Sequence, residues 1–188
     1  MRPKETQLAE RVDAATVGVQ YEHEVLENGM TLVYITDPSQ KSAQLNVMLK
    51  TDLRKETPST NGITKVALDM LGNGTSRVSK SRFLKKIDTS GSILSKQLGN
   101  MSLTYSLKFL PEEFSALSPL FLNSFFDPRY RDDIFVSVKE KALFDLKVQH
   151  DSWWSSAFMT FKKQFFKDTP YGLSKKGEIA TVSSLTDS

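Results

Sequence analysis

The 188-residue sequence contains no cysteine and only two histidines, His23 and His150. The absence of cysteine excludes disulfide bonds and thiolate metal sites, and it fits a reducing cytosol and a bacterial periplasm equally well. His150 is followed by Asp151 and Ser152, but neighbouring side chains at a helix end cannot adopt the geometry of a catalytic triad. His23 lies in a β-prone run, where we expect it to face water.

Long apolar runs and a strong net charge are missing as well. No run of about eighteen apolar residues exists, so the sequence has no candidate transmembrane segment, and its polar start is unlike a secretory leader. The formal net charge is only +3, because 25 Lys and Arg residues nearly balance 22 Asp and Glu residues. No strong field for nucleic acid follows. The cations between Arg77 and Lys86 predict a solvated helix face, with phosphates or an acidic partner as the alternative.

The first patterns that are present predict β-strands. Residues 21–26 and 31–35 are β-prone and flank Asn28-Gly29, which is a strong signal for a hairpin turn. Residues 43–49 alternate apolar and polar side chains, which predicts a third, half-buried strand. We therefore expect a three-strand meander at the start of the chain. Strict alternation over residues 101–109 predicts a further strand.

Helical spacing of apolar residues dominates the rest of the sequence. The predicted helices cover residues 63–71, about 80–90, 111–126, 132–150 and 152–167. Because strands lead and helices follow, we predict an α+β fold, a mostly antiparallel sheet with helices packed on one face, rather than a doubly wound parallel sheet. The last helix carries an aromatic stripe, which we interpret as core or as the docking face of a missing lobe. Its members are Trp154, Phe158, Phe161 and Phe165.

Four segments together resemble the pitrilysin/insulinase-type metallopeptidases. The stretch Val25–Val33 resembles the opening hairpin of their lobes, and Gly62–Thr75 matches their metal-binding helix in frame, length and ending. Asn123–Tyr130 and Thr169–Gly172 resemble the end of a later helix and a downstream H-P-Y-G segment. The order and spacing of all four agree with the family. The resemblance implies a first lobe over residues 21–188, cut short at its C-terminal end, after an extension over residues 1–20.

The resemblance also shows that the family's chemistry has been replaced in this chain. The family helix carries H-x-x-E-H, in which two histidines bind Zn²⁺ and the glutamate acts as general base. Lys65, Leu68 and Asp69 stand at these three positions, and Asp145 stands near the family's third ligand, a glutamate. We therefore expect no catalytic residue, no metal site and no cofactor. The three charged residues are expected to form a salt-bridged cluster or to be simply solvated.

A short strand is expected over residues 93–97, where the family pairs its backbone with an extended peptide. Leu94, Ser95, Lys96 and Gln97 occupy this place instead of the family's Asn-Ala-x-Thr. Backbone pairing needs no particular side chain, so this edge is predicted to bind an extended segment by β-augmentation. The alternative is an ordinary edge strand that is covered by other parts of the protein.

The expected function is that of a non-catalytic homologue of a zinc peptidase, which acts as the scaffold or substrate-binding subunit of a pitrilysin-type peptidase. The expected partners are an active pitrilysin-type subunit or a second lobe, with extended peptides as further candidates. Two alternatives stay open: an active zinc metallopeptidase with non-standard ligands, and a core-type structural subunit of a membrane assembly. The bacterial periplasm is favoured over the cytoplasm or the mitochondrion.

Overall fold

The computed structural model describes residues 21–51, 55–167 and 169–186. The chain divides into two units, one ending at Lys41 and the other beginning at Ser42. Each unit is described by itself.

The described part of the first unit is the predicted hairpin. Strands β1 (Tyr21–Val25) and β2 (Thr31–Ile35) pair antiparallel. The turn is closed by backbone hydrogen bonds between Leu26 and Met30, at 2.8 Å, and from Gly29 to Leu26, at 2.9 Å. Gly29 has a φ of 81°, a conformation that glycine adopts without steric cost. The Asn-Gly signal is confirmed.

The sheet of the second unit has three antiparallel strands in the order β3-β5-β4. These are β3 (Ala43–Lys50), β4 (Ile93–Leu98) and β5 (Ser102–Phe109). The expected meander is wrong, because β3 takes β5 as its partner and does not continue the hairpin sheet. In this register Leu45 lies opposite Leu107 and Val47 opposite Tyr105. The apolar side chains of β3 thereby join the core that β5 also faces.

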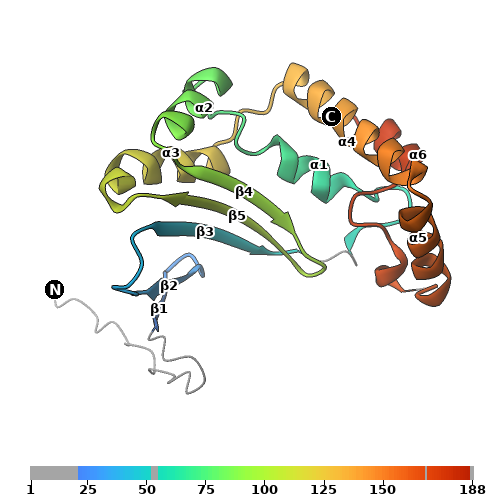
Figure 1. The fold of residues 1–188 in the computed structure, drawn as a ribbon, viewed down its shortest axis with the longest axis horizontal. Helices are drawn as coiled ribbons and strands as arrows, with labels where there is room; N and C mark the ends of the chain where they lie inside the picture. The colour runs from blue at the N-terminus through green and yellow to red at the C-terminus, as the bar shows by residue number, and fades with distance from the viewer. Residues whose placement is uncertain (1–20, 52–54, 168, 187–188) are drawn as a thin grey trace. The chain divides into compact units, whose positions relative to one another are not determined.

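The first five helices of the second unit follow the predicted order, and the sixth was not predicted. The described helices are α1 (Ile63–Met70), α2 (Lys80–Thr89), α3 (Phe114–Phe126), α4 (Asp132–Asp151), α5 (Trp153–Phe165) and α6 (Ile179–Ser184), with single 3-10 turns at Pro111–Glu113 and Pro170–Gly172. Figure 1 shows α1, α2 and α3 over one face of the sheet, and α4, α5 and α6 gathered near one end of it. The predicted α+β fold is confirmed. None of the described helices is long and apolar enough to cross a membrane.

Two apolar clusters hold this unit together. In the larger one, Phe83 of α2, Leu107 of β5 and Phe121 of α3 are fully buried. Tyr105 also belongs to it: its ring stacks on Phe121 with the centroids 4.7 Å apart, and its hydroxyl lies 2.8 Å from Ser124 Oγ. Burial raises the pKa of Tyr105 to about 12, since the charged form would lose its solvation. The smaller cluster joins α1, α4 and α6 through Val66, Leu146 and Val182.

The aromatic stripe of α5 is not part of either cluster. Helix α5 has no buried residue, and the four side chains of the stripe are 55% to 69% exposed. The interpretation as core is therefore wrong. Helical spacing shows that side chains share a face, but it does not show whether that face meets the protein or solvent. The second interpretation, a docking face, stays a prediction.

Candidate functional site

Helix α1 is held at its first turn by a buried carboxylate. Glu56 Oε2 accepts hydrogen bonds from Asn61 Nδ2 and from the backbone N–H of Gly62, both at 2.9 Å. Its Oε1 accepts from the backbone N–H of Thr64 at 3.0 Å. Amide groups at a helix start lack intrahelical partners and favour a negative charge. Glu56 therefore fixes the start of α1, a role that the sequence analysis missed because the glutamate lies six residues before Gly62 in a polar loop.

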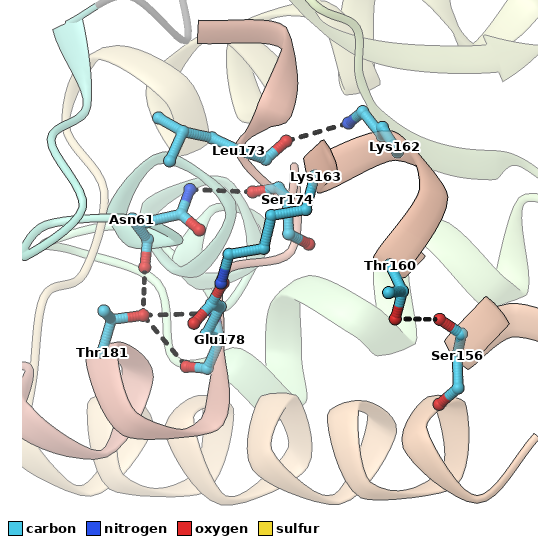
Figure 2. Close-up of polar contacts among 9 residues, drawn as sticks. All are labelled: Asn61, Ser156, Thr160, Lys162, Lys163, Leu173, Ser174, Glu178 and Thr181. Atoms are coloured by element: carbon cyan, nitrogen blue, oxygen red, sulfur yellow. Dashed lines mark hydrogen bonds and ion pairs between the residues drawn. The ribbon is translucent and has the colours of Figure 1, made fainter. Parts of the chain in front are cut away.

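Asn61 connects the start of α1 to the end of the described chain. Its Nδ2 donates to the backbone oxygen of Ser174 at 2.8 Å, and its own backbone oxygen accepts from Thr181 Oγ1 at 2.8 Å, as Figure 2 shows. Gly62 and Gly177 meet closely at this point, because a Cβ on Gly62 would lie 2.8 Å from the Gly177 Cα. The segment after α5 is thus locked against α1.

Lys65 and Asp69 of α1 form an ion pair one helical turn apart. Both side chains are about 30% exposed, so the pair is partly screened by solvent. Leu68 lies between them in sequence but points elsewhere, because its side chain is 2% exposed and packs in the larger apolar cluster. The position of the family's general base is therefore occupied by a core side chain.

Asp145 of α4 forms its ion pair within its own helix. Lys141 Nζ lies 2.7 Å from Asp145 Oδ2, and this hydrogen bond is the main reason why the pKa of Asp145 lies below its usual range. Lys65 contributes only a weak Coulombic attraction to Asp145. The expected single cluster of Lys65, Asp69 and Asp145 is replaced by two separate i,i+4 pairs, since such neighbours on one helix meet without any tertiary adjustment.

Lys96 of β4 is a further cation at this place. Its Nζ donates a 2.8 Å hydrogen bond to the backbone oxygen of Asp69, in the last turn of α1, where the helix dipole favours cations. Burial lowers the pKa of Lys96 to about 8, although the attraction of Asp69 opposes this shift. The sequence analysis places Lys96 on a predicted peptide-binding strand. It does not predict the contact with α1, because a strand pattern does not show which face of the strand a helix covers.

The residues at this place do not fit a zinc ion. A catalytic zinc site needs about three protein ligands, and ammonium groups cannot serve while they are protonated. Asp69 is bracketed by the ammonium groups of Lys65 and Lys96, and Asp145 is paired with Lys141. Across residues 21–51, 55–167 and 169–186, no three His, Cys, Asp or Glu side chains come together as a possible metal site.

The edge strand lies beside this place. β4 pairs on one side with β5, and within the described parts of the chain no strand pairs with its other side. Leu94 and Lys96 turn towards the helices, whereas Ser95 and Gln97 are exposed. The binding of an extended segment at this side of β4 stays a prediction.

The fold and this site define the class of the protein: it is a lobe of the metallopeptidase type in which the metal-binding helix carries other side chains. The model of the family Insulinase (Peptidase family M16) matches residues 31–177, which is well over half of the chain. The chain therefore belongs to the insulinase family of peptidases.

Two solved structures are similar to the described fold. A protease from Helicobacter pylori superposes with a TM-score of 0.82 at 16% identity, over 89% of this chain and 41% of that one. An inactive domain of peptidase M16 from Pseudomonas fluorescens has a TM-score of 0.80 at 14% identity, over 88% of this chain and 40% of that one. At these identities the likeness shows the fold alone. This chain spans about two fifths of the length of either protein.

Proposed function

We propose that this chain is a lobe of a peptidase homologue that cleaves nothing on its own and acts as the scaffold or substrate-binding subunit of an active peptidase. The proposal rests on the side chains that α1 carries at the positions of the family motif. Lys65 and Asp69 neutralise each other where the family has its two histidines, and Leu68 is buried where the family has its glutamate.

Hydrolysis of a peptide bond by this family's chemistry needs a metal that activates water and a base that takes its proton. Among the described residues, the site has neither a set of ligands for the metal nor, at position 68, a side chain that can act as the base. The ammonium group of Lys96 donates to a neutral backbone oxygen near the place of the metal, and its positive charge would repel Zn²⁺. Leu68 cannot take a proton, and its burial in the core leaves no room to turn towards a substrate.

Peptide binding can persist without this chemistry, and the free side of β4 supports it. An extended segment that adds to a sheet edge gains main-chain hydrogen bonds whatever its side chains are. Helices lie on one face of the sheet and do not pair with its edge (Figure 1). We therefore propose that Leu94–Gln97 bind an extended peptide.

The proposed partner is an active pitrilysin-type subunit or a second lobe. The similar domain from Pseudomonas fluorescens, which is described as inactive, supports the idea that lobes of this fold occur without catalysis. The aromatic face of α5 offers apolar surface to such a partner. The bacterial periplasm is our proposal for the compartment.

The test is cleavage of a fluorogenic peptide by the full-length protein, alone and mixed with an active M16 peptidase subunit. We expect no chelator-sensitive cleavage by the protein alone, and a change in rate when it is added to the active subunit. A copy of the peptide with N-methyl groups at alternate residues serves as the control for pairing at β4, because it lacks the backbone donors. Chelator-sensitive cleavage by the protein alone would contradict the proposal.

A further inference from the structure

A groove of about 960 Å³ lies between α4, α5 and the segment that follows α5. Its apolar wall comes from Phe144 and Val148 of α4 and from Phe158 of α5, and each of these side chains is more than half exposed. Apolar side chains that line an open groove are typical of a surface that meets a partner.

The groove is also lined by cations. Lys162 of α5, Lys175 and Lys176 all line it. Figure 2 shows how Lys162 is held: its Nζ donates to the backbone oxygen of Leu173 at 2.9 Å. That partner is neutral, so the charge of Lys162 is not compensated. No carboxylate of the described residues lies within 4.0 Å of Lys175 or Lys176 to form an ion pair.

The acidic side chains nearby cancel only part of this charge. Among the described residues, Asp145 is the one acid that lines the groove; it attracts Lys176, but its ion pair is with Lys141 at 2.7 Å. Lys163, the neighbour of Lys162 in sequence, turns to the other side of α5 and pairs with Glu178 at 2.9 Å (Figure 2). The lysines of α5 thus differ: one is neutralised by a carboxylate and one faces the groove with its charge free.

The groove reaches the turn that follows β4. β4 ends at Leu98, and Asn100 in the turn that follows lines the groove. A strand advances about 3.3 Å per residue, so a peptide paired along the six residues of β4 is about 20 Å long and leaves the sheet at the groove. The next few residues of such a peptide would lie in the groove, within reach of its apolar side chains and its three lysines.

We infer that this groove binds the continuation of an extended peptide that carries acidic and apolar side chains, and so gives the lobe a preference for acidic segments. The inference rests on the proposed function, because it adds a charge preference to the proposed peptide binding. Carboxylates in the peptide complete the ion pairs that Lys175 and Lys176 lack, and aromatic or aliphatic side chains cover the wall formed by Phe144 and Phe158.

The test uses the full-length protein and two labelled peptides of equal length that alternate phenylalanine and valine with either glutamate or glutamine. Fluorescence anisotropy at low salt measures both dissociation constants. We expect the glutamate peptide to bind about tenfold more tightly, and the preference to shrink as salt is added. Equal binding of the two peptides, or tighter binding of the glutamine peptide, overturns the inference and leaves the proposed lack of cleavage untouched.

Three variants locate the effect. The double variant Lys175→Gln, Lys176→Gln is expected to raise the dissociation constant of the glutamate peptide about tenfold. We expect it to change that of the glutamine peptide by no more than about twofold. Arg82→Gln with Lys85→Gln changes the net charge equally at the exposed face of α2, and we expect an effect within about twofold. Lys163→Gln, beside the groove but paired with Glu178, is also expected to stay within about twofold.

The outcomes separate the inference from the proposed function. An equal loss in the α2 variant overturns the inference, because net charge would then explain the preference. Failure of both peptides to bind overturns the inference together with the proposed peptide binding at β4. Chelator-sensitive cleavage with an intact preference for glutamate overturns the proposed function alone, since the groove would then serve an active enzyme.

Discussion

The surroundings of Asp69 on α1 and the groove beside α5 differ in whether their charged and apolar side chains have partners within the protein. At the first, Asp69 is bracketed by two lysines, and Leu68 is buried in the core. At the second, Lys175 and Lys176 have no carboxylate partner in the described structure, and Phe158 is 55% exposed. Side chains that satisfy one another serve the fold. Those left without partners support the proposal that another molecule binds at the groove.

The largest expected effect comes from placing a glutamate in each region. Leu68→Glu restores the residue type of the family's general base but buries a carboxylate among apolar side chains, so we expect a loss of about 3 kcal/mol or more in the free energy of unfolding. Phe158→Glu makes a similar change on an exposed wall and is expected to stay within about 0.5 kcal/mol. Urea unfolding of both variants measures the contrast. Similar losses would break the comparison.

The next effect concerns the carboxylate that fixes α1. Glu56→Ala leaves three buried or half-buried donors without their acceptor, so we expect a loss of about 2–3 kcal/mol in the free energy of unfolding. The matched change Glu178→Ala removes an exposed carboxylate that caps α6, and we expect about 1 kcal/mol or less. A smaller loss for Glu56→Ala than for Glu178→Ala, again by urea unfolding, would show that α1 is not held as described.

Lys96 predicts a dependence of stability on pH. Its folded pKa of about 8 lies below the usual lysine pKa of 10.5, so the unfolded chain binds more protons between these two values, and stability rises as pH rises through this window. The rise is expected to be on the order of 1 kcal/mol and to vanish in Lys96→Met. Burial lowers the pKa of Lys162 as well, but we expect Lys162→Met to change the profile less. Unfolding midpoints between pH 7.5 and about 10.5 test this. An unchanged profile in Lys96→Met would contradict the burial of its ammonium.

The smallest expected effects are those of single charges. Lys65→Met removes the partner of Asp69, and partly exposed pairs of this kind contribute about 0.2–1 kcal/mol. Lys176→Met, in the groove, has no ion pair to lose and is expected to leave stability unchanged or slightly raised, because it relieves repulsion among the groove lysines. Differential scanning calorimetry at low salt distinguishes the two. A clear destabilisation by Lys176→Met would show that the groove lysine has a structural partner after all.

The sequence predicted those features that depend on local patterns. Three features could be predicted because each depends on neighbours in the chain: the Asn28-Gly29 turn, the strand β5 and the position of α1. The pairing of β3 with β5 was not, since strand partners distant in sequence are chosen by how their apolar faces meet.

The residues of the candidate site could be predicted from the sequence, but most of their contacts were not. The replaced positions Lys65, Leu68 and Asp69 follow from the motif, and the i,i+4 spacing of Lys141 and Asp145 was there to be noticed as a second pair. The roles of Glu56 and Lys96 could not be predicted, because both side chains bind backbone groups of α1 that any sequence would offer.

The central claim is that the place of the metal site is filled by Lys65, Asp69 and Lys96, which do not make a zinc site. Elemental analysis of the full-length protein, purified without chelators and dialysed against a slight excess of Zn²⁺, tests it most directly. The account predicts far less than one zinc per chain, and no change after Asp145→Ala. About one zinc per chain, lost on adding a chelator and lost in Asp145→Ala, would contradict it.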